Sequence, residues 1–215
     1  ERDSTWNTWY ENGNKRFLAT YSDGKLNGKY TRWYQGGIIK EQDGDYTNNK
    51  KHNRWVFWAK NGQKSEEINY NTGIQNGPHI KWFGDSSDQH KKFHKNFKNG
   101  EKDGAWHYWY TTGVDSLKSS YLEGKKDGHW VWWRSNGLKD KEGFYKKEKK
   151  HGVWTVWNDS SGTAYHKLHE ETFVNDIIDG SVTKWYKEGD IDRQGVMRGK
   201  EREGEWINWE KGGKR

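Results

Sequence analysis

Aromatic residues recur along this chain at fixed distances from a small anchor residue. Nine segments begin at such an anchor, carry an aromatic or apolar residue two positions later in most cases, and carry tryptophan five positions later. The segment Gly128–Gly137 shows the pattern most fully, with Trp130, Trp132 and Trp133 ahead of an Asn-Gly pair. Short alternation of this kind is typical of a β-strand, and Asn-Gly predicts the tight turn of a hairpin.

The anchors divide the chain into repeating units. They are separated by 24, 25, 24, 27, 24, 24, 28 and 24 residues, and the residue five positions after each anchor is tryptophan in all nine units. The units start near Ser4, Gly28, Asn53, Gly77, Gly104, Gly128, Gly152, Gly180 and Gly204. A fixed period of this length indicates an array of identical supersecondary elements, each resting on its neighbours.

Each unit is predicted to form one β-hairpin. A tryptophan-rich first strand leads into a glycine turn, and a more polar second strand ends on an aromatic residue, or on Met197 in the eighth unit. A second turn then leads to the next anchor. The best helical candidate, 163–176, aligns better as a lengthened second strand. We therefore predict an all-β fold, an elongated single-layer antiparallel hairpin array over residues 1–215 as a single domain, with an incomplete last unit and no substantial helix.

Strand parity separates two faces of the predicted sheet. Positions +3 and +5 from the anchor share one face, where tryptophan and mostly β-branched residues predict a packed stripe. Positions +2 and +4 share the other face, where position +4 varies widely. The partner-binding residues predicted on this face are Phe57, Trp106, Tyr108, Trp130 and Trp132. Trp132 is the first of these to test, because other units carry Thr, Arg, Lys or Asn at its position.

Composition would by itself suggest disorder. Charged residues make up 32% of the chain and the mean hydropathy is −1.42, both typical of segments that lack a packed core. The chain nevertheless has 16 tryptophans and 12 tyrosines, and aromatic side chains bury large areas each. The net charge of +7 leaves a polyanion-binding surface open, and the absence of cysteine excludes disulfides and thiol chemistry.

The unit pattern resembles a known repeat family. The sequence G-x-W-x-x-W-Y-x-x-G, then an aromatic residue and x-x-G-K-x-x-G, is similar to the MORN repeat and most similar to the bacterial MORN-variant repeat of YwqK-family antitoxins. The units 104–127 and 128–151 match best, and the resemblance covers essentially the whole chain. It implies a twisted hairpin array that serves as a binding scaffold, without implying a particular ligand. Departures from the pattern occur at Asn53, His79, Glu148, Asp176, Val182 and Lys200.

Catalytic, metal and cofactor chemistry find little support in the sequence. His90 and His94 would lie about 13 Å apart on a strand, too far to share a metal ion. Acidic turns such as 43–45 lack the closing glutamate of a calcium loop. Adjacent carboxylates such as Glu66 and Glu67 point to opposite faces of a strand. We expect no enzyme activity, no metal site and no cofactor.

Two lengthened units supply a further prediction. The fourth and seventh units, of 27 and 28 residues, both open their extra length with Asp-Ser-Ser and then carry histidine. Insertions in a repeat array project from one side of it. Extended hairpins there are expected to contact a partner through Asp85, His90, His94, Asp159, His166 and His169, although tolerated hairpin extensions explain the same residues.

The leading functional expectation is a non-enzymatic scaffold for a partner protein, either a toxin or a subunit of an envelope complex. Carbohydrate binding and binding to anionic lipid or polyanions stay open as alternatives, while no nucleic-acid motif is recognised. Membrane association is expected only through the partner or an anchor preceding Glu1, because no apolar run is long enough to span a membrane. The composition fits a bacterial protein, with export favoured over a cytoplasmic location.

Overall fold

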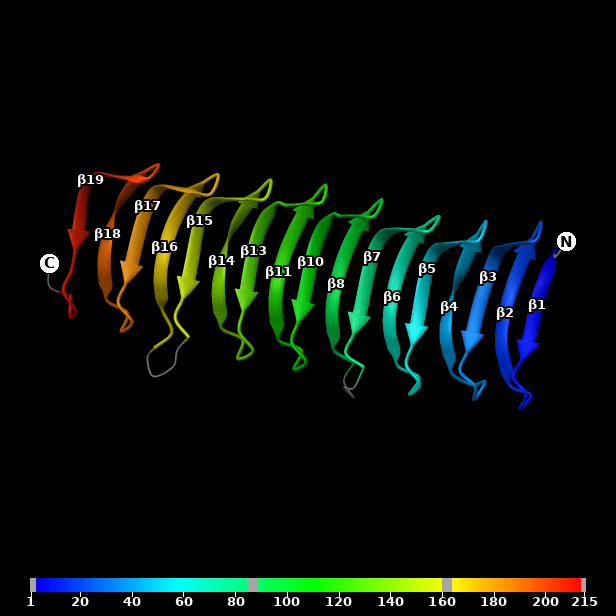
Figure 1. The fold of residues 1–215 in the computed structure, drawn as a ribbon. Helices are drawn as coiled ribbons and strands as arrows, with labels where there is room; N and C mark the ends of the chain where they lie inside the picture. Colours follow the sequence, from blue (N-terminus) through cyan, green and yellow to red (C-terminus); the bar gives the residue numbers. More distant parts are fainter. Residues whose placement is uncertain (1–2, 85–88, 160–163, 214–215) are drawn as a thin grey trace. The chain divides into compact units, whose positions relative to one another are not determined.

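A computed structural model describes residues 3–84, 89–159 and 164–213 of the chain. Its 19 strands and no helix confirm the predicted all-β class for these residues. Two compact units are present, Glu1–Gly113 and Val114–Arg215, and the boundary falls at the turn inside the fifth repeat. Each unit is an open, single-layer meander in which consecutive strands lie side by side and antiparallel (Figure 1).

The strands follow the hairpin pattern expected from the repeats. In the N-terminal unit they are β1 (Ser4–Trp9), β2 (Lys15–Ser22), β3 (Lys25–Trp33), β4 (Lys40–Thr47), β5 (Lys50–Trp58), β6 (Lys64–Asn71), β7 (Ile74–Trp82), β8 (Lys91–Lys98), β9 (Glu101–Lys102) and β10 (Gly104–Trp109). In the C-terminal unit they are β11 (Asp115–Leu122), β12 (Lys125–Lys126), β13 (Gly128–Trp133), β14 (Lys139–Lys146), β15 (Lys149–Trp157), β16 (Lys167–Val174), β17 (Ile177–Trp185), β18 (Ile191–Arg198) and β19 (Glu201–Asn208).

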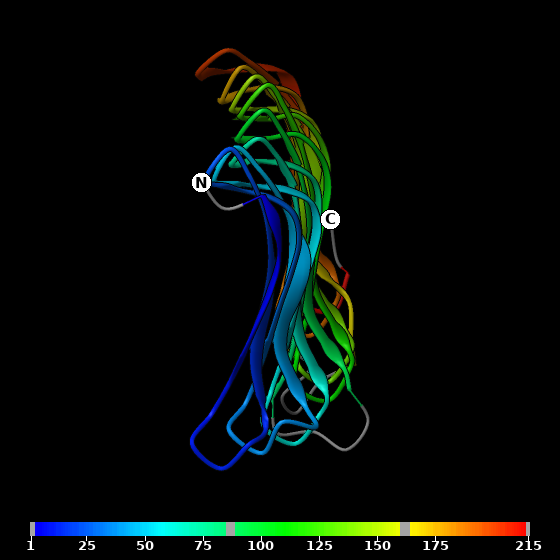
Figure 2. The ribbon, with the colours of Figure 1, turned by 90° about the vertical axis from the view of Figure 1, so that its right-hand side faces the viewer.

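A β-bulge recurs opposite the +5 tryptophan. In β13 and β14, Trp132 pairs with Lys141 and Trp133 pairs with Lys139, so Asp140 is the extra residue. The same shift occurs beside six other +5 tryptophans. Such bulges increase the twist of a strand pair, and the first strands of the N-terminal unit, coloured blue to cyan, bend along their length (Figure 2).

Left-handed backbone geometry explains the anchor column. Every anchor after Ser4 has a positive φ, including Asn53 at +57°. Glycine adopts this region without strain, and asparagine tolerates it better than most residues. At Gly28 a Cβ atom would also approach the Thr20 side chain to 3.1 Å. Asn53 therefore keeps the geometry of the anchor instead of weakening the repeat.

The second turn of most repeats also uses left-handed residues, in consecutive pairs. The pairs are Asp23–Gly24, Asn48–Asn49, Thr72–Gly73, Asn99–Gly100, Glu123–Gly124, Lys147–Glu148 and Asn175–Asp176. This is the geometry of a type I′ turn, which matches the twist of the flanking strands. The resemblance placed Glu148 and Asp176 among its departures, yet both occupy the same backbone position as glycine.

Side chains in these turns link consecutive hairpins. The backbone N–H of Leu26 donates to Asn49 Oδ1 at 2.7 Å, and that of Lys150 donates to Asp176 Oδ1 at 2.7 Å. The N–H of Lys126 donates to Glu148 Oε1 in the same way. Wherever one of these three residues replaces the turn glycine, its side-chain oxygen satisfies a backbone donor of the preceding repeat.

At the other end of the strands, near the first turn of each repeat, tyrosine hydroxyls and one arginine link consecutive hairpins. Tyr10, Tyr34 and Tyr186 each donate from the phenol oxygen to the carbonyl of the next +5 tryptophan, at 2.7 Å in all three cases. Arg134 replaces tyrosine in the sixth repeat and donates to the Trp157 carbonyl at 2.9 Å. These four repeats are thus tied to the next hairpin at this end of their strands.

The buried core differs from the expected one. Tryptophans at position +2 supply most of it, with Trp55, Trp106, Trp130 and Trp154 no more than 5% exposed. The invariant +5 tryptophans are half-buried or exposed, and Trp9 is 57% exposed. The expectation that the +5 tryptophans form the packed stripe is therefore wrong, although Val56 and Val131 at position +3 are buried.

Each buried +2 indole is held by a hydrogen bond from its Nε1. The acceptor is always the backbone carbonyl ten residues earlier, as in Trp154 to Phe144 at 3.0 Å and Trp55 to Asp45 at 2.9 Å. Buried polar groups are costly without a partner, so this bond lets a large indole be buried completely. The largest buried side chains of this single layer therefore lie on one face, while smaller +3 residues such as Val56 and Val131 are buried on the other.

Candidate functional site: the aromatic face

In each unit, the face that carries positions +2 and +4 holds groups of contacting rings, and it is called here the aromatic face. In the N-terminal unit Tyr30, Tyr46, Trp55 and Phe57 contact one another, with ring centroids 4.9–6.2 Å apart. A second group in that unit contains His79, Phe93, Phe97, Trp106 and Tyr108. In the C-terminal unit the row contains Tyr121, Trp130, Trp132, Tyr145, Trp154 and Phe173.

Lysine ammonium groups lie over these rings. Lys51 Nζ is 4.3 Å from the Trp55 ring centroid, Lys95 Nζ is 3.8 Å from that of Phe93, and Lys150 Nζ is 4.5 Å from that of Trp154. Cation–π attraction holds an ammonium at such distances. Burial lowers the pKa of Lys51, and burial together with nearby Lys102 lowers the pKa of Lys95. The aromatic face therefore presents buried rings beneath a row of cations.

The reverse face has a different chemistry and is called here the ion-pair face. It carries the +3 and +5 side chains and a row of carboxylates from the second strands, including Asp43, Glu67, Glu142 and Glu170. Lysines three residues earlier pair with them, as in Lys139 to Glu142 at 2.9 Å and Lys167 to Glu170 at 2.6 Å. Carboxylates thus offset the lysines on this face, whereas the cations of the aromatic face lie mainly over rings.

One ion pair on this face predicts a pH dependence of stability. Arg54 donates two hydrogen bonds of 2.6 Å to Glu67, and these hold the pKa of Glu67 below its ordinary value. A carboxyl with a lowered folded-state pKa stabilises the fold above its unfolded pKa, near 4.3 for glutamate, and loses that contribution as the pH falls through the folded value. Glu67→Gln should therefore flatten the loss of stability between about pH 6 and pH 3.

Urea unfolding midpoints measured across that pH range check this expectation. Glu210→Gln, at an exposed position near the end of the described chain, is the matched control and should follow the wild-type profile. Arg54 is half-exposed, so the effect will be modest. Parallel profiles for wild type and Glu67→Gln would contradict the assignment.

All five aromatic residues predicted to bind a partner lie on the aromatic face. Trp106 and Trp130 are buried, at 5% and 4% exposure, and belong to the +2 core. Phe57, Tyr108 and Trp132 at position +4 are half-buried and keep part of each ring accessible. The structure does not test their role in binding, but it makes the +4 residues the accessible members of the set.

The predicted residues of the two extended hairpins are not brought together. His90 Nδ1 lies 3.0 Å from the Thr111 carbonyl oxygen, whereas His94 is in β8 on the ion-pair face, paired with Ile80. His166 lies against Asn158 and the Tyr186 carbonyl, while His169 is in β16 on the aromatic face, 3.8 Å from Glu171.

The acidic residues of the same prediction add no ligand cluster. Asp159 is exposed, and Asp85 lies outside the described residues. Among residues 3–84, 89–159 and 164–213, no three His, Asp or Glu side chains are close enough to hold a metal ion. The role of these hairpins in contacting a partner stays a prediction.

No family model and no curated protein matches this chain. The described residues contain no helix that could cross a membrane. The resemblance to MORN-variant repeats thus stays a prediction from the residues themselves, and the aromatic face has to be interpreted from its own geometry.

Residue-by-residue prediction missed the cations of the aromatic face. Lys51, Lys102, Lys126 and Lys150 all stand two residues before an anchor, and each lies over the +2 tryptophan of its own repeat. This column was visible in the aligned repeats. The overall composition does not reveal this column, because lysines are spread over the entire chain.

Proposed function

We propose that this chain is a non-enzymatic, MORN-like scaffold that binds an acidic segment of a partner protein along its aromatic face. The observation that supports it is the row of aromatic rings with lysines over them, in which the +4 rings of Phe57, Tyr108 and Trp132 are only half-buried. In the described residues no helix and no second sheet covers this face. Exposed aromatic surfaces with cations favour protein interfaces, and their positive charge is complementary to carboxylates.

The same geometry weighs against carbohydrate binding. A sugar ring stacks on an open aromatic face, but ammonium groups lie over the rings of Trp55, Trp130 and Trp154 at 4.3–5.4 Å. The resemblance to antitoxin repeats makes a toxin, or a subunit of an envelope assembly, the first class of partner to test. A lipid or polyanion ligand is the alternative that the experiment must separate.

A pair of lysines on one strand tests which face binds. Lys141 lies 5.0 Å from the Trp132 ring centroid on the aromatic face, while Lys139 lies on the ion-pair face because of the bulge at Asp140. Lys141→Gln and Lys139→Gln make the same change of charge two residues apart on opposite faces. Affinity capture from the native cell with each variant, followed by binding measurements on the purified partner, compares the two faces.

We expect Lys141→Gln to weaken binding of the purified partner by about fivefold or more, and Trp132→Ala to weaken it further. Lys139→Gln should leave the affinity nearly unchanged. Carbodiimide coupling of partner carboxylates to lysines should label Lys126 and Lys150 before Lys139. Melting curves confirm that each variant is folded. Equal losses from both faces, or coupling mainly on the ion-pair face, would contradict the proposal, and capture of lipid or nucleic acid alone would favour the alternative.

A further inference from the structure

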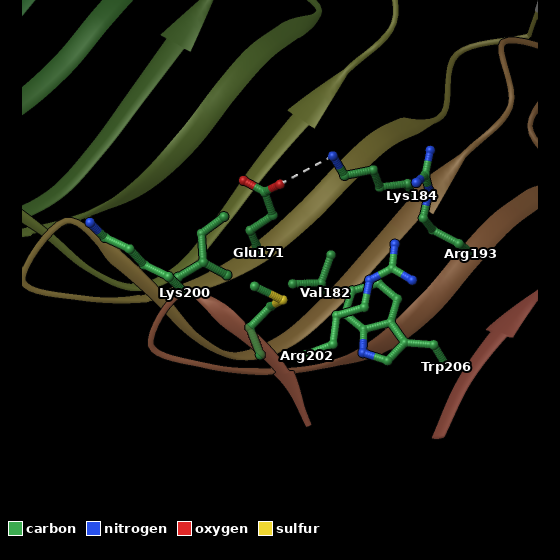
Figure 3. Close-up of a pocket in the computed structure, with 9 residues that line it drawn as sticks. Glu171, Val182, Lys184, Arg193, Lys200, Arg202 and Trp206 are labelled. Atoms are coloured by element: carbon green, nitrogen blue, oxygen red, sulfur yellow. Dashed lines mark ion pairs between the residues drawn. The ribbon is translucent and has the colours of Figure 1, made fainter. Parts of the chain in front are cut away.

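A hollow interrupts the aromatic face of the C-terminal unit. It lies over β16 to β19 and has a volume of about 310 Å³ (Figure 3). Its apolar floor includes Val182 and Met197, and the Trp206 indole forms one wall. This size is at the lower end for pockets that enclose a small ligand or one large side chain.

The hollow exists because the eighth repeat lacks its +2 tryptophan. Val182 stands where the flanking repeats place Trp154 and Trp206, and Met197 replaces the aromatic residue that ends most second strands. In those flanking repeats the indole Nε1 donates to the carbonyl ten residues earlier, at 3.0 Å and 3.1 Å. Val182 supplies neither the ring nor the donor. The space left open is therefore that of one aromatic side chain in the row.

The rim of the hollow is strongly cationic. Lys184, Arg193, Lys200 and Arg202 line it, and Glu171 is the one carboxylate in the lining. Arg193 Nε also donates to the Asp192 carboxylate at 3.0 Å, outside the lining. Lys184 lies 3.7 Å from Glu171, and the Arg202 guanidinium lies 4.5 Å from the Trp206 ring centroid. Figure 3 shows these cationic side chains arranged around Val182. An occupant that fits has an apolar ring for the floor and negative charge at its edges.

We propose that the hollow binds an aromatic side chain flanked by carboxylates in the acidic segment of the partner protein. This inference rests on the proposed function and specifies where the segment is anchored. The guest ring takes the place of the missing +2 indole, between Trp206 and the preceding repeat. Its flanking carboxylates pair with Arg193, Lys200 and Arg202, which lie around the rim. A buried aromatic anchor within a charged rim is the usual arrangement of an interface hot spot.

Titration calorimetry with synthetic peptides tests this inference on the full chain. The probe is the blocked peptide Glu-Glu-Trp-Glu-Glu, compared with Gln-Gln-Trp-Gln-Gln and Glu-Glu-Ala-Glu-Glu. We expect saturable binding of the probe. Both control peptides should bind at least about tenfold more weakly than the probe, because one lacks the charges and the other lacks the aromatic anchor. Binding of the alanine peptide as strong as that of the probe would instead show a polyanion site and overturn the inference.

Filling the hollow from within provides the decisive variant. Glu171→Gly with Val182→Trp recreates the pairing of a small residue and tryptophan seen at Gly143 and Trp154. The double variant should keep its melting curve and lose about tenfold or more of its affinity for the probe. Arg193→Gln tests the rim without changing the core and should weaken binding by about fivefold. Lys139→Gln, which removes one positive charge from the ion-pair face, is the matched control and should retain affinity.

The two proposals fail in different ways. If the filled variant and Arg193→Gln both bind the probe as wild type does, the anchor lies elsewhere on the aromatic face and the hollow is excluded. If no peptide binds to wild type, the proposed occupant is wrong. Partner capture by the Lys141 and Lys139 variants decides the role of the face independently in both cases.

Discussion

Replacing Trp154 with alanine is expected to lower the free energy of unfolding by about 3–5 kcal/mol. Its indole is 5% exposed, donates to the Phe144 carbonyl, and contacts the rings of Trp132, Tyr145 and Phe173. Alanine would leave a cavity under several rings and an acceptor without its donor. Urea unfolding followed by circular dichroism measures the change.

The invariant tryptophan three residues later is the matched control for that experiment. Trp157 lies on the ion-pair face, is only half-buried, and contacts Lys139 and Tyr165 at its ring. Trp157→Ala should lower the free energy of unfolding clearly less than Trp154→Ala does, although position +5 is tryptophan in every repeat. Equal costs at the two positions would show that burial in this structure does not decide stability.

Adding one methyl group at Gly143 is expected to destabilise the protein by about 1–3 kcal/mol. A Cβ atom there would come within 2.2 Å of the Trp154 ring, and Gly44 and Gly195 stand in the same relation to Trp55 and Trp206. The φ of Gly143 is not left-handed, so the cost comes from overlap with the indole alone. The same unfolding measurement detects it.

Two comparisons isolate the cause. Gly36→Ala places a Cβ atom in open space at a backbone φ that is also not left-handed, and should leave stability nearly unchanged. Combining Gly143→Ala with Trp154→Ala should cost little more than Trp154→Ala alone, because the added methyl then enters vacated space. If the double variant instead lost the sum of the two single losses of unfolding free energy, the added methyl would have to clash with a group other than the Trp154 indole.

The repeat period and turn glycines were sufficient to predict the hairpin array. Each glycine column corresponds to a left-handed residue that L side chains adopt poorly, so periodicity in sequence translates directly into backbone geometry. Asn53 was taken as a departure from the pattern, yet it keeps the left-handed geometry of the anchor because asparagine tolerates that region better than most residues. The bulge could not be predicted, since Asp140 resembles any other polar residue on a second strand.

The identity of the buried tryptophan column was not predicted, because invariance was taken as a sign of burial. A better signal was the residue that lies beneath the +2 ring. A glycine of the preceding repeat lies beneath the rings of Trp55, Trp154 and Trp206, whereas the bulky Glu171 pairs with Val182. Lys95 stands at the corresponding strand position before Trp106 and breaks this correlation, so the aligned sequence suggests the pairing and only the three-dimensional structure establishes it.

The bonds between hairpins have a consequence for the history of the gene. The indole, tyrosine and turn-carboxylate bonds described above join residues 10, 23 and 26 positions apart, and the repeats that make them offer their neighbours similar donors and acceptors. In-frame duplication or loss of one repeat during recombination would therefore create a junction that already fits. Such a chain can change the length of its surface one hairpin at a time, and short sequence separations keep the folding of each added hairpin fast.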